Sequence, residues 1–437
     1  MKRRLLPILM TLVLVCALPI WAAFVTSGDV TNPLVCTAGA TLPDLQAKID
    51  AAADNATITL DSDTTITETL VITGKTLTLD LNGCVLRMRG TGSVLEVSDR
   101  ATLTIQDSSA AKSGTITGGN AEDGDGGGVY VEAYAALEMT GGCITGCRAE
   151  DGGVYIDNNA TLKMTGGCIT DCHASYGGGI YSYENLYMGG TAKIEKCTSN
   201  GGSYDAIWNR ERCNIYADGG TVDGTVSNLG TIMHSEGAAA ETVFNGTVYN
   251  RSAGKIEAGI YKGTVENTGT ITGGTFYDAV TNRKASLSFM TEAGTISGGT
   301  FYGSIVNEGG PEQVADSAKV AVTFNTDGGT SVAEEKVLRG QKMSKPAAPT
   351  KSGYTFTGWE DANGAYDFNT PVIAPLTLTA RWEEVPSSGG NYYYHPTTDT
   401  KADDAKGSPK TADPGVALYA ALSLLSLTGL TCTAKKR

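Results

Sequence analysis

Residues 127–147 read GGVYVEAYAALEMTGGCITGC, and residues 152–172 read GGVYIDNNATLKMTGGCITDC. Fourteen of the twenty-one aligned positions are identical, at an offset of 25 residues. A third, partial copy follows over residues 180–197. Self-similarity at a fixed period is typical of repeat architectures, in which each unit buries its apolar face against the next unit.

The repeated units have the pattern of short β-strands. Apolar and polar residues alternate in them, and glycine and asparagine interrupt the runs. Weaker copies continue at offsets of 17 and 25 residues, which leave no room for crossover helices and do not fit an antiparallel sandwich. A coil of three short strands and three turns fits both periods. Since parallel crossovers are almost always right-handed, the sequence predicts an all-β protein with a right-handed parallel β-helix over residues 55–312.

Stacking of such coils places equivalent side chains about 4.8 Å apart, so the apolar repeat positions should form interior ladders. At about 20–25 residues per coil, a rod of roughly 250 residues has about 10–12 coils. The expected ladders are Val129/Val154/Ile180, Leu137/Leu162/Leu186, Met139/Met164/Met188 and Ile144/Ile169/Ile194.

The N-terminal end of the rod needs a cover, because it exposes apolar ladders and unpaired strand edges. Residues 41–53 read TLPDLQAKIDAAA, and a threonine and a proline at the start of this stretch suit a helix N-terminus. Leu42, Leu45, Ile49 and Ala52 fall on one helical face. The segment of residues 24–54 is therefore predicted to contain an N-terminal cap helix.

Composition and charge restrict the partners. The 437 residues include 56 glycines and 3 histidines, and the formal net charge of the chain is −14. Glycine recurs as Gly-Gly pairs at the expected coil corners, where turns favour it. The acidic balance argues against nucleic acid as a partner, and so few histidines leave little room for imidazole catalysis. Between residues 24 and 411 there are 27 basic and 46 acidic residues, a net charge of −19.

The N-terminus has the order of a secretory signal peptide. Basic residues 2–4 precede an apolar run that ends at the small residues Ala22 and Ala23. Residues 1–23 are therefore predicted to direct export. An uncleaved anchor and a lipoprotein signal at Cys16 are the alternatives.

The C-terminus has three parts in order: Ser408-Pro409-Lys410-Thr411-Ala412, the apolar residues 415–432, and a basic end. Eighteen mostly apolar residues form a helix of about 27 Å, about one hydrocarbon core. This order resembles an LPXTG-type sortase sorting signal, with Ser408 in place of Leu and Ala412 in place of Gly. The resemblance implies sortase as a processing partner, cleavage after Thr411 and attachment to peptidoglycan. Residues 408–437 could instead be an ordinary membrane anchor.

A second module follows the rod. Residues 320–330 read VAVTFNTDGGT, residues 351–360 read KSGYTFTGWE, and residues 376–382 read LTLTARW. Their alternation predicts strands, and Phe324, Phe356, Trp359 and Trp382 are its candidate core. These stretches resemble the internalin-type B repeat, or Listeria–Bacteroides repeat. The resemblance implies a small β-grasp-like module of bacterial surface proteins, without catalytic residues, over residues 318–384. The polar residues 385–407 read as a flexible stalk.

The repeat array, with TLTLDLNG at residues 76–83, resembles the pectate-lyase-like β-helix of secreted surface proteins. This resemblance implies the fold and leaves the chemistry open, because the same scaffold serves lyases, hydrolases and adhesins.

Several cysteines recur with the repeat. Stacked small side chains, disulfides between adjacent coils, and a zinc site that includes His173 are three interpretations of them. The repeat aligns Cys143 with Cys168, and Cys147 with Cys172 and Cys197.

An acidic cluster, Glu122, Asp123, Asp125, Glu150 and Asp151, is predicted to lie in the turns of successive coils. Reverse turns commonly carry such residues. The cluster could otherwise bind calcium, with Asp123, Asp125, Glu150 and Asp151 as the ligands. It could also supply paired carboxylates for glycoside hydrolysis, with Arg148 as the nearest basic residue.

Two further rows of residues recur. Tyr130, Tyr155 and Tyr181 alternate with inward residues, so we expect an outward row that either stacks as a structural ladder or binds sugar rings. A row of asparagines is expected to stack at turns that need left-handed backbone geometry. Its members are Asn228, Asn250, Asn267, Asn282 and Asn307.

Taken together, the sequence predicts an extracellular protein anchored in a Gram-positive cell wall. It would be a non-enzymatic adhesin or display rod without catalytic residue, metal or cofactor. Its expected partners are peptidoglycan and host or bacterial surface glycans or proteins, and it would contact a membrane only through its C-terminal segment. The alternative is a glycan-binding or polysaccharide-degrading β-helix enzyme, which acidic and basic side chains converging on one coil face would favour.

Overall fold

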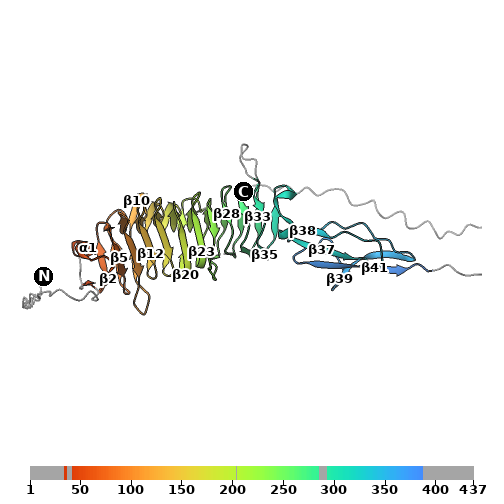
Figure 1. Cartoon of the computed structure of the whole chain (residues 1–437), viewed down its shortest axis with the longest axis horizontal. Helices are drawn as coiled ribbons and strands as arrows, with labels where there is room; N and C mark the ends of the chain where they lie inside the picture. The colour runs from red at the N-terminus through yellow and green to blue at the C-terminus, as the bar shows by residue number, and fades with distance from the viewer. Residues whose placement is uncertain (1–33, 37–41, 203, 285–292, 387–437) are drawn as a thin grey trace, which may run out of the picture. The chain divides into compact units, whose positions relative to one another are not determined.

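The computed structural model describes residues 34–36, 42–202, 204–284 and 293–386, and these confirm the all-β class. The strands stack one above another from β2 to β35, and α1 lies at the N-terminal end of the stack (Figure 1). The predicted signal peptide, most of the stalk, and the sorting signal with Ser408 to Ala412 lie outside the described residues. None of the helices in the described ranges is long and apolar enough to cross a membrane.

One face of the rod is an eleven-stranded parallel sheet that takes one strand from each coil, so the eleven coils agree with the predicted number. Its strands are β4 (Leu70–Thr73), β7 (Leu95–Ser98), β11 (Val129–Val131), β15 (Val154–Ile156), β19 (Ile180–Ser182), β22 (Ile207–Asn209), β24 (Val226–Asn228), β27 (Val248–Asn250), β30 (Val265–Asn267), β33 (Val280–Asn282) and β36 (Ile305–Asn307).

The other two faces form a single sheet of twenty-one strands, because the long strands β20 and β23 run through both faces. The strands are β1 (Leu34–Cys36), β2 (Ala56–Leu60), β3 (Thr64–Ile66), β5 (Thr76–Asp80), β6 (Val85–Met88), β8 (Thr102–Gln106), β9 (Thr115–Thr117), β12 (Ala136–Met139), β13 (Cys143–Thr145), β16 (Thr161–Met164), β17 (Cys168–Thr170), β20 (Leu186–Glu195), β23 (Asn214–Asp223), β25 (Thr231–Met233), β26 (Val243–Phe244), β28 (Lys255–Ile256), β29 (Ile260–Tyr261), β31 (Thr270–Ile271), β32 (Thr275–Phe276), β34 (Thr295–Ile296) and β35 (Thr300–Phe301).

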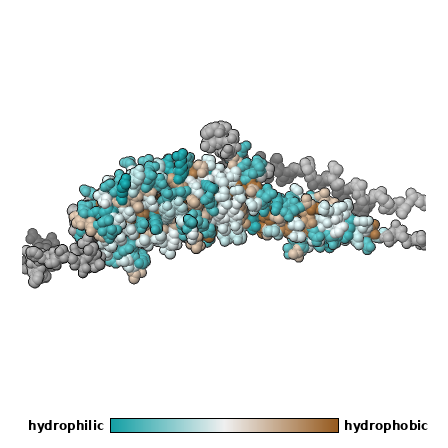
Figure 2. Space-filling view, viewed as in Figure 1, coloured by the Kyte–Doolittle hydropathy of each residue, from teal (hydrophilic) through white to brown (hydrophobic). Residues whose placement is uncertain are grey.

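The four apolar ladders are confirmed, since their members are paired residue by residue in parallel strands. Each member is at most 1% exposed, so the ladders form the continuous core of the rod. The face of the rod drawn in Figure 2 is mostly teal and white, that is, hydrophilic to intermediate in hydropathy.

The predicted cap helix is confirmed as α1 (Leu42–Ala51), which buries Leu45 and Ile49 against the first coils. The Gln46 amide donates to the carbonyl of Val71 (3.0 Å) and accepts from its N–H (2.9 Å). It thereby replaces the strand that is missing at the edge of β4. Lys75 Nζ donates to three carbonyls at the end of the helix, at 2.9–3.1 Å, which complements the helix C-terminus.

The asparagine row is stacked as predicted, but its expected position at left-handed turns is wrong. The members end strands of the eleven-stranded sheet, and none of them has a positive φ. The row also begins one coil earlier, at Asn209. Nδ2 of each of the first five donates to Oδ1 of the next asparagine at 2.7–2.9 Å and to a carbonyl of the turn beside it. The first five side chains are fully buried, so the ladder is part of the core.

The C-terminal end of the rod contains two short 3₁₀ helices, η1 (Pro311–Gln313) and η2 (Asp316–Ala318). Val314 and Ala318 belong to the rod core, and Leu338 of the next module packs against it. Ile305 donates its N–H to the carbonyl of Arg339 at 2.8 Å, which pairs part of the last strand edge. The rod and the module belong to one compact unit that ends at Val385.

The module is a five-stranded mixed sheet in the order β38-β37-β41-β39-β40. Its first and last strands pair in parallel at the centre, as expected for a β-grasp-like sheet. Trp359 and Phe324 are buried in the predicted core, and Phe356 and Trp382 pack against it. The strands are β37 (Lys319–Asn325), β38 (Glu335–Leu338), β39 (Tyr354–Asp361), β40 (Gly364–Ala365) and β41 (Leu376–Glu384).

The asparagine ladder leads to a stability prediction. Asn250→Ala should lower the free energy of unfolding by about 2–3 kcal/mol, because it removes a buried amide, leaves the Asn267 side-chain oxygen without its donor and takes an acceptor from Asn228. Urea denaturation followed by circular dichroism measures this loss. The control, Asn158→Ala, removes an exposed amide and should change stability by less than about 0.5 kcal/mol. Equal effects of the two substitutions would contradict the structural importance of the ladder.

Candidate ligand-binding site

A small fourth sheet lies beside four successive coils of the rod. Its strands are β10 (Asn120–Asp125), β14 (Arg148–Asp151), β18 (His173–Tyr176) and β21 (Thr198–Ser199). Gly126 and Gly152 then turn the chain into the next strand with φ of 65° and 69°. A Cβ at either position would collide with the backbone of that strand, so only glycine fits. These turns hold the ends of the small sheet next to the outer side of β11, β15 and β19.

Three rows of outward side chains lie there, and we call them together the aromatic–acidic face. The central row comes from β11, β15, β19 and β22, and equivalent residues of adjacent coils are paired in parallel register. One flanking row ends the strands of the small sheet and continues to Tyr204. The other flanking row follows the central strands directly. The rows are Tyr130/Tyr155/Tyr181/Trp208, Asp125/Asp151/Tyr176/Tyr204 and Glu132/Asp157/Tyr183/Arg210.

The central tyrosines alternate with inward residues as predicted, but they are not exposed as expected. Tyr155 is 7% exposed and Tyr181 is 3% exposed. The ring of Tyr155 is stacked between Tyr130 at 5.3 Å and Tyr181 at 5.6 Å, so both of its faces are covered. The ladder reading therefore describes Tyr155 and Tyr181, and within this stack Tyr130 keeps the more accessible ring.

At one end, an aromatic cluster closes the stack. The Trp208 ring lies 5.0 Å from Tyr181, 4.8 Å from Tyr204 and 4.7 Å from Tyr176. Tyr176 remains 42% exposed. The indole Nε1 of Trp208 is buried and has no hydrogen-bond partner among the described residues.

Arg210 is the basic residue of this face. Its Nη1 donates to the hydroxyls of Tyr181 and Tyr183, both at 2.7 Å. Its guanidinium lies 4.2 Å from the ring centroid of Tyr183, in a cation–π arrangement. Burial is the main cause of the raised pKa of the Tyr181 hydroxyl, whose oxygen accepts the hydrogen bond from Arg210.

The acidic cluster lies in strands β10 and β14 rather than in turns, which corrects the expected location. Asp125 and Asp151 are directly paired on adjacent coils. Burial, with the nearby Asp125 and Glu150, raises the pKa of Asp151 to about 6, although Arg210 opposes the shift. Burial, Glu150 and Asp157 raise the pKa of Asp125 as well. Asp151 Oδ1 is buried and has no hydrogen-bond partner among the described residues.

The structure brings together only part of the predicted calcium set. Asp125 and Asp151 are adjacent and Glu150 acts on both of them, whereas Asp123 is exposed and does not. Within the described residues, no group of three or more His, Cys, Asp or Glu side chains could hold a metal ion. Arg148, the basic residue nearest to the acids in the sequence, is exposed and does not affect them. The basic residue that acts on Asp151 is Arg210.

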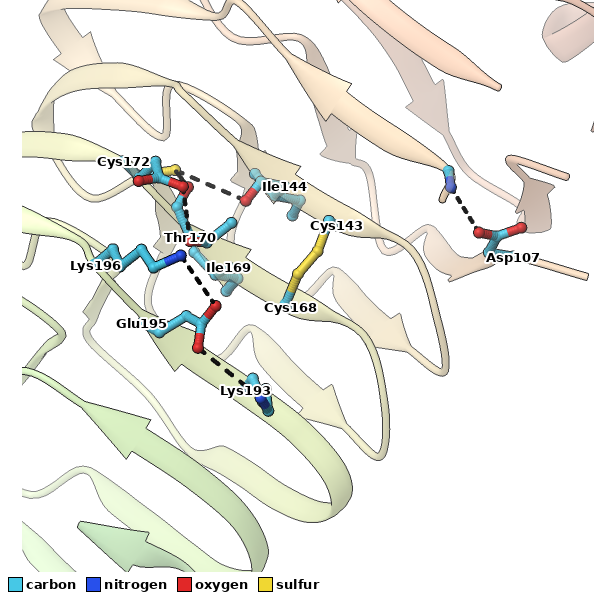
Figure 3. Close-up of a disulfide and its surroundings, with 12 residues drawn as sticks. Asp107, Cys143, Ile144, Cys168, Ile169, Thr170, Cys172, Lys193, Glu195 and Lys196 are labelled. Carbon is cyan, nitrogen blue, oxygen red and sulfur yellow. Dashed lines mark hydrogen bonds and ion pairs between the residues drawn. A yellow bond between two sulfur atoms is a disulfide. The ribbon is translucent and has the colours of Figure 1, made fainter. Parts of the chain in front are cut away.

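The cysteines divide into two groups. Cys143 and Cys168 form a disulfide between adjacent coils, with their Cα atoms 4.5 Å apart (Figure 3). Cys147, Cys172 and Cys197 are buried free thiols inside the rod. His173 bonds to Thr198 at 2.9 Å. Two of the three interpretations are therefore found, a disulfide and a stacked ladder, and the zinc set is not assembled.

Comparison with known proteins concerns mainly the second module. Residues 321–381 match the family model described as the Listeria-Bacteroides repeat domain. A putative Gly-rich membrane protein of Evansella cellulosilytica is 36% identical over 66 residues, 14% of this chain and 8% of the relative. A putative membrane protein of the same organism is 38% identical over 78 residues, 17% of this chain and 11% of the relative.

Internalin H of Listeria monocytogenes is 34% identical over 91 residues, 20% of this chain and 16% of the relative. The chain thus spans less than a fifth of each of these three relatives. The class that fold and comparisons define is an all-β rod protein with a Listeria-Bacteroides repeat. The repeat and these relatives indicate a bacterial surface protein.

Asp151 leads to a prediction on pH and stability. Its folded pKa of about 6 exceeds the ordinary 3.8, so its charge destabilises the fold above pH 6 and has no effect below pH 3.8. Asp151→Asn should therefore raise the free energy of unfolding at pH 7.5. The full shift corresponds to about 3 kcal/mol, and screening at this partly exposed site reduces the expected gain to about 1 kcal/mol.

Urea denaturation at pH 7.5 and pH 4 measures this difference. The gain should shrink as the pH falls through 6 towards 4. Asp123→Asn, at an exposed position of the neighbouring strand β10, should leave stability unchanged at both pH values. A loss of stability for Asp151→Asn at pH 7.5 would show that the carboxylate stabilises the fold.

Proposed function

We propose that this protein is exported, attached to a Gram-positive cell wall and acts there as a non-enzymatic adhesin. The observation that carries the proposal is the uninterrupted stack of eleven coils, which holds outward side chains in long, rigid rows. A solenoid of this kind offers an extended binding surface. The Listeria-Bacteroides repeat and the similarity to internalin H support a location at the cell surface.

The aromatic–acidic face is the proposed binding surface. It combines exposed ring area at Tyr176, a fixed guanidinium at Arg210, and two carboxylates, Asp125 and Asp151, that form no ion pair within the described part of the chain. Rigid aromatic side chains flanked by a few polar groups are typical of sites for sugars and other extended ligands. We therefore assign glycans as the ligand class of the adhesin.

A polysaccharide-degrading enzyme is the second candidate. The pKa of Asp151 near 6 favours this reading, because a carboxyl group that holds its proton near neutral pH can act as a general acid. Asp125 on the adjacent coil would be the second carboxylate. We prefer the binding function because Arg210, the one basic residue acting on Asp151, is already engaged by two tyrosine hydroxyls.

Wall attachment is tested at the sorting signal. Thr411→Ala should remove the protein from the cell-wall fraction, because sortase joins the carbonyl of this residue to the wall. Immunoblots of wall, membrane and medium fractions measure the change. Thr398→Ala, in the predicted stalk, is the matched control and should leave the protein in the wall. An unchanged wall fraction for Thr411→Ala would refute sortase attachment.

Binding and catalysis are separated by a glycan array screened with purified residues 24–411, alongside assays for new reducing ends in polysaccharides. We expect binding to a set of glycans and no cleavage. Cleavage that disappears in Asp151→Asn would overturn the adhesin proposal in favour of the enzyme. The pH data above exclude misfolding of that variant as the cause if its stability rises as predicted.

A further inference from the structure

We infer that the aromatic–acidic face recognises polysaccharides with free amino groups, that is, de-N-acetylated amino-sugar chains. This inference rests on the proposed function and specifies its ligand. The argument starts from the spacing of aromatic and charged residues on the outer side of the eleven-stranded sheet.

An aromatic residue and the residue two positions later lie next to each other on this side in several coils. In the C-terminal coils the second residue is arginine: Trp208 is followed by Arg210, and Tyr249 by Arg251. Arg251 lies 4.8 Å from the ring centroid of Tyr249, and Arg210 lies 4.2 Å from that of Tyr183. The chain thus supplies its own cations to the rings there.

The N-terminal coils have the opposite charge at the same position. Tyr130 is followed by Glu132, and Tyr155 by Asp157. Neither of these carboxylates, nor Asp125 or Asp151, forms an ion pair among the described residues. Arg100 lies over the ring of Tyr134 nearby, but no cation among the described residues lies over the Tyr130 or Tyr155 ring.

The Tyr130 ring is the accessible end of the stack. It has a ring neighbour on one side, Tyr155, while the adjacent coil on the other side places Glu96 in the equivalent position. The charges that raise the pKa of Tyr130, after burial, are all carboxylates: Asp157, Asp125, Glu132 and Glu96. A partly exposed ring face surrounded by negative charge favours an ammonium group.

The acids are also unfavourable to the fold by themselves. Asp125 and Asp151 are stacked on adjacent coils, with both pKa values raised and one oxygen of Asp151 buried without a partner. Perturbed groups of this kind are concentrated at functional sites. A bound cation between them would relieve the repulsion that the fold leaves in place.

The repeat favours a polymer over a small cation. Equivalent residues recur about every 4.8 Å along the rod, so a polymer of repeating units can contact several coils at once. An amino-sugar chain presents an ammonium group and an apolar ring face on each residue. The ammonium groups match the acids in the coils of β11 and β15. The ring faces match Tyr176 and its neighbours in the coils of β19 and β22. A lysine-rich peptide supplies the charge without the ring faces.

The test is calorimetric titration of the exported protein with the hexamer of glucosamine, the hexamer of N-acetylglucosamine and hexalysine. We expect the glucosamine hexamer to bind at least tenfold more tightly than either of the others. Binding should weaken as salt is added, because ammonium–carboxylate contacts carry it. Equal affinity for the two sugar hexamers would overturn the inference while leaving the adhesin proposal intact, and equal affinity for hexalysine would show that charge alone is recognised.

Matched variants locate the site. Asp151→Asn and Glu132→Gln should each weaken binding of the glucosamine hexamer at least fivefold, and Tyr130→Leu should do the same through the ring face. Because Asp151→Asn is expected to stabilise the fold, loss of binding in it cannot be attributed to unfolding. Glu122→Gln, exposed in β10, should bind like the wild type. Unchanged binding in all three site variants would overturn the assignment to this face, and no binding of any hexamer would overturn the ligand class.

Discussion

Parallel, in-register pairing between successive coils is the constraint on which the rest of the structure depends. It places each side chain about 4.8 Å from its counterpart in the next coil, so like residues meet like residues along the rod. For Leu137, Leu162 and Leu186 this builds a dry core. For the asparagines it builds a chain of amide hydrogen bonds, because an amide is both donor and acceptor and can pair with its own kind.

The same pairing is unfavourable for carboxylates, which only accept hydrogen bonds and repel one another. Asp125 over Asp151 is therefore a different kind of ladder from Asn250 over Asn267, although both arise from the same register. The fold compensates for the cost of the acidic pair with its apolar and amide ladders in other parts of the rod. The unfavourable acidic pair lies on the same face as the aromatic rings and the Arg210 guanidinium. We therefore propose a function for the aromatic–acidic face rather than for the asparagine ladder.

Features that repeat at a constant offset could be predicted from the sequence. The ladders, the cap helix and the module strands follow from local periodicity and are found where expected. Features that combine different coils could not. Arg148 is near the acids in the chain, but Arg210, from two coils further on, is the residue whose charge acts on Asp151. The burial of Tyr155 depends on rings above and below it, and the polar cap by Gln46 and Lys75 depends on contacts at the rod end.

A uniform scaffold can still localise a binding site, because the identity of the residue two positions after each ring changes along the rod. Where this residue is Arg251, it lies over the ring of Tyr249, and Arg210 lies over the ring of Tyr183 in the preceding coil, so the chain supplies cations to these rings. Where it is Glu132 or Asp157, the ring is flanked by charge that nothing among the described residues neutralises. In the part of the chain that the structure describes, the outer side of the sheet therefore carries guanidinium groups beside its rings in one half and carboxylates without ion pairs in the other, although the backbone of both halves is the same.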